Sequence, residues 1–126
     1  MKTYYLDNLF LNAVLRQTPF SSPALIYVGL FTIAPTATGG GTEVAGLYYA
    51  RQAVIFGPPV NGQTANLSDV VYPVAGAAWG TVVAFGLFDA FTGGNLLYFN
   101  NLSVPRNVAI NDQLRFAASQ ILCGEA

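Results

Sequence analysis

Short β-prone runs separated by turn-forming residues occupy the chain from residue 25 onward, and they constrain the fold more than any other feature. Leu25–Ile33 and Tyr49–Phe56 are rich in β-branched and aromatic residues, which favour strands. Further runs lie at Ala65–Pro73 and Gln113–Cys123. Glycine, proline and asparagine between the runs are typical of turns. Turns at such short intervals predict antiparallel strands rather than strands alternating with helices.

The clearest local signal is a β-hairpin. Thr81–Phe91 and Asn95–Val104 are β-prone runs joined by Thr92, Gly93 and Gly94, and short loops that contain glycine commonly join hairpin strands. We expect Pro105 and the Asn111–Asp112 pair to bracket the next short stretch. Five to seven strands then predict a mainly β fold, either an antiparallel sandwich or a small barrel, with a helix on an edge or a face. At 126 residues the chain has the usual length of one domain, so we expect residues 1–126 to form a single domain.

The amino-terminal segment carries the clearest helical pattern, at about residues 4–16. Thr3 is placed to cap this helix. Leu11 and Leu15 lie off the main apolar stripe and need a second apolar surface. Either a place deep in the chain's own fold or a neighbouring subunit would supply that surface, and on the second alternative both leucines are candidate interface residues. The main stripe, which we expect to face the chain's own sheet, comprises Leu6, Leu9, Phe10, Ala13 and Val14.

A glycine-rich segment separates the first two β-prone runs. Gly39, Gly40 and Gly41 predict a mobile loop between strands. No lysine followed by serine or threonine comes after these glycines, and no helical pattern follows, so a phosphate-binding loop is not expected. Should the helix be wholly internal, the candidate contact with a partner lies on the strands or on the loop around Gly40.

The scarcity of charge indicates a protein that associates. Only 9% of the residues are charged and 53% are apolar, against about 25% charged in ordinary soluble domains. Such a surface exposes uncharged patches, which usually mark interaction sites; a neutral monomer rich in small residues is the alternative. The basic residues are scattered and the formal net charge is −1. Binding to nucleic acid or to an anionic membrane surface is therefore not expected, because both need clustered basic residues.

Neither a membrane span nor a secretion signal is expected. The uncharged stretch 70–88 contains Pro73 and three glycines, which predict two strands around a loop at about residues 75–80. The amino terminus lacks the basic, apolar and small-residue order of a signal peptide, so synthesis in the cytoplasm is expected. The single Cys123 excludes an intramolecular disulfide.

The residues offer little chemistry. The chain has no histidine, which removes the usual general base and the commonest metal ligand. We expect Asp89 and Asp112, which flank turns, to bond nearby backbone amides. No catalytic residue, cofactor site or metal site is expected, and an enzyme acting on cell-wall sugar would need two carboxylates facing each other in a cleft. The carboxylates are spread along the sequence at Asp7, Glu43, Asp69, Asp89, Asp112 and Glu125.

Segments across most of the chain resemble a family of short proteins that are encoded among bacteriophage structural genes and often labelled tail fibre protein. The resemblance implies a non-enzymatic virion protein, made in the host bacterium, without catalytic residues. Similar small β proteins also serve as head decoration, or cement, proteins. The segments that carry the resemblance are Ala24–Thr36, Gly40–Phe56, Ala78–Phe99 and Asn111–Ala118.

Physical reasoning weighs the two virion roles. A fibre shaft needs repeats or a long coiled coil, and this chain has neither an internal repeat nor a sustained heptad. A cement protein needs a neutral, compact body with many modest contacts related by symmetry. The sequence thus favours a head decoration subunit that forms homo-oligomers and binds the major capsid protein or other phage structural proteins. A tail fibre, tail-tip or adaptor component, with or without receptor binding, is the alternative.

Overall fold

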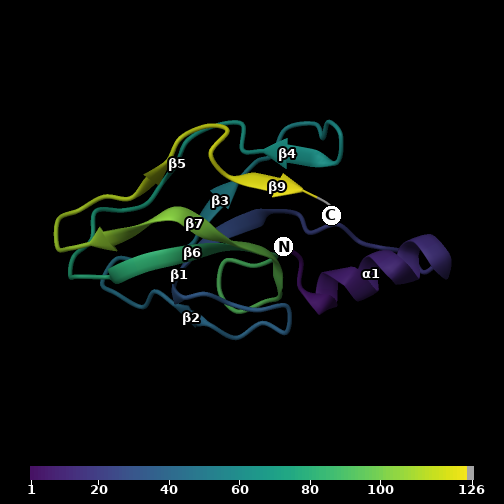
Figure 1. Ribbon diagram of the computed structural model, residues 1–126, viewed down its shortest axis with the longest axis horizontal. Coiled ribbons are helices and arrows are strands. Elements are labelled where there is room, and N and C mark those ends of the chain that lie inside the picture. The colour runs from purple at the N-terminus through teal and green to yellow at the C-terminus, as the bar shows by residue number, and fades with distance from the viewer. Residues whose placement is uncertain (125–126) are drawn as a thin grey trace.

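The computed structural model describes residues 1–124 as a mainly β, sandwich-like fold with one helix at the amino terminus (Figure 1). Its main sheet has the order β2-β1-β6-β7, with β3 also paired to β1. All of these pairings are antiparallel, as the sequence predicts. The strands of this sheet are β1 (Ile26–Ile33), β2 (Thr42–Glu43), β3 (Gln52–Val54), β6 (Gly80–Phe88) and β7 (Leu96–Val108).

Two small sheets complete the fold, and no sheet within residues 1–124 closes into a barrel. Side chains from these sheets and from the segments beside them meet the main sheet in one apolar core. The sandwich alternative of the predicted fold class is therefore the one that forms. The small sheets pair β4 (Gln63–Ala65) with β9 (Leu122–Gly124), and β5 (Val70–Val71) with β8 (Arg115–Phe116).

Aromatic rings fill the middle of the core. The ring of Tyr72 lies against those of Tyr49, Trp79 and Phe116 at centroid distances of 6.2–6.5 Å. Its buried hydroxyl donates to the carbonyl oxygen of Val28 at 2.7 Å, which satisfies a polar group that would otherwise be costly to bury. Phe85, Leu87 and Phe116 are buried in this core, whereas Tyr98 is only half-buried.

The hairpin predicted near residue 93 is confirmed, with β6 and β7 as its strands. Asp89 Oδ1 accepts a bond from the Asn95 amide at 2.7 Å, and Asp112 Oδ2 accepts one from the Ala109 amide at 2.9 Å. Both aspartates thus bond local backbone, as expected. Pro105 does not end β7, because it lies where the register with β6 shifts and β7 is the outermost strand of its sheet, the position in which a sheet tolerates proline.

The predicted long strand at 113–123 is wrong, because a turn divides it into β8 and β9. Asn66, which is buried, explains the division. Its side-chain amide donates to the carbonyl oxygen of Ala117 at 3.0 Å, and its side-chain oxygen accepts from the Ile121 amide at 2.8 Å. Asn66 also interrupts the predicted run at 65–73, of which only β5 and the end of β4 are strand.

The loop predicted around Gly40 contains a turn and the short strand β2, which the sequence pattern did not indicate. Thr36 and Gly39 exchange two backbone bonds of 2.8 Å, which close a tight turn. β2 follows directly and pairs with β1. Gly39, Gly40 and Gly41 all have positive φ angles, between 73° and 94°, which glycine adopts at little cost. The glycines serve an ordered reversal of the chain.

Candidate assembly interface

Residues 1–15, which we call the arm, begin as an extension of the main sheet. Met1 and Phe99 of β7 exchange two backbone hydrogen bonds, of 3.0 and 2.9 Å. The Thr3 amide donates to the carbonyl oxygen of Leu97 at 3.0 Å. Lys2 lies opposite Tyr98 as an isolated antiparallel bridge. The arm therefore covers part of the outer edge of β7, an edge that would otherwise expose unpaired backbone groups.

Thr3 then turns the chain into α1 (Tyr4–Leu15). Its side-chain oxygen accepts from the Leu6 amide at 3.4 Å, so Thr3 is the amino-terminal cap that the sequence predicts. The Thr3 hydroxyl also donates to the carbonyl oxygen of Leu96 at 2.7 Å. The Tyr4 amide donates to the carbonyl oxygen of Ala37 at 2.8 Å. The first turn of the helix is thus fixed to both β7 and the turn that precedes Gly39.

We call strands β1–β9 and the loops between them the β body. Beyond its first turn, α1 leaves the β body and projects beside it (Figure 1). Leu6 is the buried residue of the helix, with 2% of its surface exposed. Leu11 and Leu15 are 54% and 72% exposed, so the alternative of a helix deep in its own fold is wrong. Val14 is 76% exposed, although we expected it to face the sheet.

The predicted apolar stripe is only partly buried, because the axis of α1 diverges from the sheet. A stripe predicted from spacing alone assumes that the whole helix lies along one surface. Here only the first turn is bonded to the sheet, so burial decreases along the helix. Leu6 is buried and Val14 is exposed. The residues between them on the stripe are half-buried: Leu9, Phe10 and Ala13.

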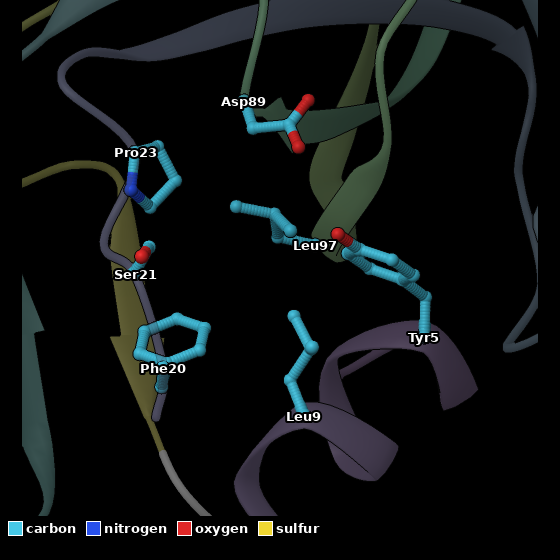
Figure 2. Close-up of a pocket in the computed structure, with 7 residues that line it drawn as sticks. All are labelled: Tyr5, Leu9, Phe20, Ser21, Pro23, Asp89 and Leu97. Carbon is cyan, nitrogen blue, oxygen red and sulfur yellow. The ribbon is translucent and has the colours of Figure 1, made fainter. Parts of the chain in front are cut away.

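A hollow of about 160 Å³ separates the helix from the segment that follows it. Tyr5 and Leu9 of α1 face this hollow from one side, and Phe20 and Pro23 of the following segment face it from the other (Figure 2). Leu97 of β7 forms part of its wall. The helix is therefore incompletely packed against the segment that follows it, although the rings of Phe10 and Phe20 meet at a centroid distance of 5.6 Å.

The candidate residues Leu11, Leu15 and Gly40 do not form one cluster. Gly40 is exposed, and its turn contacts the base of the arm through the bond between Tyr4 and Ala37. Leu11 and Leu15 lie 7 and 11 residues beyond Tyr4, or roughly 10 and 16 Å along a helix. The exposed apolar face of α1, which we define by Leu11, Val14 and Leu15, is the stronger candidate interface.

A largely buried ion pair between Arg51 and Glu43, which no sequence pattern indicates, connects the hairpin loop to β2. Arg51 Nε donates to Glu43 Oε2 at 2.9 Å, and Arg51 Nη2 donates to Glu43 Oε1 at 2.8 Å. Arg51 Nη1 donates to the carbonyl oxygens of Ala90 and Gly93 at 2.9 and 2.8 Å. The guanidinium lies 3.5 Å from the centroid of the Phe88 ring. The burial of a lone arginine beside a loop gives no pattern in the sequence, so this cluster could not be found there.

Glu43 is held as an ion in this cluster. Burial raises the pKa of Glu43, but hydrogen bonds from Arg51 and Tyr49 and the charge of Arg51 outweigh burial and hold that pKa below its ordinary value. The Tyr49 hydroxyl donates to Glu43 Oε2 at 2.6 Å. Burial and this bond raise the pKa of Tyr49. Both carboxylate oxygens thus accept hydrogen bonds from neighbouring side chains.

The other described carboxylates also have structural partners. Asp7 pairs with Lys2 at 3.3 Å and Asp69 with Arg115 at 3.6 Å, while Glu125 lies outside the described residues. Within residues 1–124, no three metal-ligating side chains gather into a possible ion site. In the same part of the chain, no helix has both the length and the apolar character needed to cross a membrane.

Comparison with known protein families identifies the family of this chain. A family model described as "Podophage GP4 fiber I protein gp80" matches residues 1–123, which include the arm, the Glu43–Arg51 pair and the whole aromatic core. No curated protein matches the chain significantly. Because the family model spans nearly all of the sequence, this chain belongs to the Gp80 family of podophage fibre I proteins.

Proposed function

We propose that this protein is a non-enzymatic subunit of a bacteriophage fibre, and that the exposed face of α1 attaches it to other virion proteins. Membership of a fibre family supports a structural role in a phage particle. The observation that carries the attachment site is the exposure of Leu11, Val14 and Leu15 on a helix whose backbone bonds to the β strands and their turns come from its start, at Thr3 and Tyr4. Contiguous exposed apolar patches commonly mark interaction sites.

The size of this apolar face fits a repeated, individually modest contact. Full burial of one valine or leucine side chain contributes about 1.5–3 kcal/mol. Leu11, Val14 and Leu15 are already partly covered, so a partner would gain roughly 3–6 kcal/mol from them before the cost of association. That range suits a subunit held by several symmetry-related contacts rather than one tight pair.

Head decoration is the second candidate, and the absence of a shaft favours it. α1 has 12 residues, far short of a coiled-coil shaft, and β1–β9 fold into a compact body. In that role the partner of α1 would be the major capsid protein. In the fibre role the chain would be a knob, an adaptor or a tip beside a shaft made by another protein.

Imaging of the purified particle distinguishes the two roles. Density for this chain on the fibres or the tail supports the fibre proposal, and density spread over the head lattice supports decoration. A particle that carries no copy of the chain would overturn both. Labelled antibodies against the arm and against the β body would show which end of the subunit faces the particle, and the fibre proposal requires that the arm be the inaccessible end.

A further inference from the structure

We propose that the arm exchanges between copies of this chain, so that the arm of one subunit occupies the β7 edge of its neighbour. The proposal concerns the anchored side of the arm, not the exposed face of α1. It therefore stands or falls independently of the fibre role. The partner is a second copy of the same chain.

The seat for the arm is specific and is present on every copy. It consists of the backbone ladder between Met1–Thr3 and β7, the bond from the Thr3 hydroxyl to Leu96, and the buried position of Leu6. Each of these contacts joins the arm to a body that it reaches only through a linker. An arm from a second copy would make the same contacts, because the seat does not depend on which chain supplies the arm.

The linker at residues 17–25 allows this exchange. Its backbone bond from Thr18 returns to Asn12 of α1 rather than to the body, and the ring of Phe20 lies against Phe10 of α1 at 5.6 Å. Most of its side chains are exposed, and it contains Pro19 and Pro23. When these contacts with α1 break, the nine residues can extend over about 30 Å, which is enough to reach a neighbouring subunit.

Concentration decides which seat the arm occupies. A short flexible linker holds the arm near its own seat at an effective concentration on the order of 1 mM. Copies that are free at micromolar concentration therefore keep their own arms. Copies packed side by side in a particle reach similar local concentrations, so exchange competes with the closed form there. The same reasoning predicts that exchange becomes visible in solution as the protein approaches about 1 mM.

A disulfide trap reports which chain supplies the arm. Lys2 and Tyr98 are opposite one another between two hydrogen-bonded pairs, Met1 with Phe99 and Thr3 with Leu97. Such a non-hydrogen-bonded pair has a Cα separation of about 4.5 Å, within the range that a disulfide spans. The variant Lys2→Cys/Tyr98→Cys, made with Cys123→Ser, is equilibrated and then oxidised at about 10 µM and at about 1 mM, the concentrations that bracket the effective value.

Non-reducing electrophoresis separates the two outcomes. Exchange predicts a cross-link within single chains at the lower concentration and a rise of about tenfold or more in disulfide-linked dimer at the higher one. The single-cysteine variants Lys2→Cys and Tyr98→Cys, each with Cys123→Ser, measure random cross-linking. Cross-links confined to single chains at both concentrations, or dimer no greater than in these controls, would overturn the proposal.

A second test uses the unmodified chain, and the engineered cysteines enter it only as a control. Light scattering should show its mean mass rising from the monomer toward the dimer over the same concentrations. The variant Lys2→Cys/Tyr98→Cys with Cys123→Ser, oxidised at about 10 µM so that each arm is held on its own body, should stay monomeric when it is then concentrated to about 1 mM. A constant monomeric mass in the unmodified chain, or an equal rise in the variant whose arm is held on its own body, would overturn arm exchange.

Discussion

The β body and the arm are stabilised in different ways. In the body, rings such as Tyr72, Trp79 and Phe116 pack around one buried centre, and their polar groups have partners. In the arm, a few backbone bonds, Thr3 and Leu6 carry the attachment, while half of the α1 residues are exposed. The packed core of the body therefore stabilises the fold, while the exposed side chains of the arm are available for association. Substitutions in the two regions should separate these properties.

The largest effect is expected for Phe116→Ala in the body. Phe116 is buried, and its ring contacts those of Tyr72 and Phe85. Removing a buried phenylalanine ring should lower the free energy of unfolding by about 3–5 kcal/mol, measured by denaturant titration. Val104→Ala, at an exposed position of β7, is the control and should change it by less than about 0.5 kcal/mol. Equal effects in the two variants would show that the core is assigned wrongly.

Arg51→Ala should cost about 3 kcal/mol, because it leaves the partly buried carboxylate of Glu43 without its counter-charge. It also leaves the carbonyl oxygens of Ala90 and Gly93 without their donor. Arg16→Ala is the matched control, since Arg16 is exposed at the end of the arm helix. Thermal unfolding of both variants compares body with arm directly. A loss in Arg51→Ala no larger than that in Arg16→Ala would contradict the role of the ion pair.

Protonation of Glu43 in this ion pair should lower the stability of the chain in acid, by less than Arg51→Ala lowers it. The pKa of Glu43 in the folded chain lies below its ordinary value of 4.5. A depressed pKa means that the stabilising contribution is fully present above about pH 5 and is lost as the pH falls through the folded pKa. Glu43→Gln removes this titration, so its free energy of unfolding should fall less steeply than that of the unmodified chain below pH 4.5. Parallel curves for the two proteins would contradict the prediction.

The sequence could predict the body's class because its signals are local. Alternating β-prone runs and glycine turns fix the antiparallel hairpin of β6 and β7. The division of the 113–123 run depends on Asn66, which is about fifty residues distant along the chain. The burial of Arg51 likewise depends on carbonyl groups of a distant loop. Contacts of this kind leave no pattern at either partner alone, so sequence spacing could not reveal them.

Only part of the candidate interface could be predicted, because spacing along the chain does not reveal how the helix meets the sheet. The off-stripe positions of Leu11 and Leu15 indicate that a single surface cannot cover the helix, and their exposure is consistent with this. Val14 was missed because helical spacing gives the direction of a side chain but not the angle at which the helix leaves the sheet. That angle is set at Thr3 and Tyr4, by bonds to β7 and to the turn before Gly39.

Thr3→Ala should loosen the arm without destabilising the body. Loss of the cap and of the hydroxyl bond to Leu96 should cost about 1 kcal/mol. Hydrogen exchange of the α1 amides should then become roughly fivefold faster, while exchange in β1 and β6 should hardly change. Thr18→Ala, the same substitution in the exposed linker, should leave both unchanged. Equal acceleration in the arm and the body would show that the two regions unfold together.

Leu11→Gln/Leu15→Gln should have the smallest effect on stability and a large effect on association. Both side chains are exposed, so the free energy of unfolding should change by less than about 0.5 kcal/mol. Binding to other virion proteins should weaken, because the apolar face of α1 loses two of its three large side chains. Leu67→Gln/Leu122→Gln alters two similarly exposed leucines of the body and should leave binding intact.

Sedimentation with purified virion proteins and circular dichroism together test this pair of variants. Unchanged binding in Leu11→Gln/Leu15→Gln would move the contact to the body, with the turn around Gly40 as the next candidate. A loss of binding in both pairs would mean that the chain associates through apolar surface in general. A loss confined to the arm variant, with the fold intact, would establish that the body supplies stability and α1 supplies the contact, since the two substitutions remove equal apolar surface from the two regions.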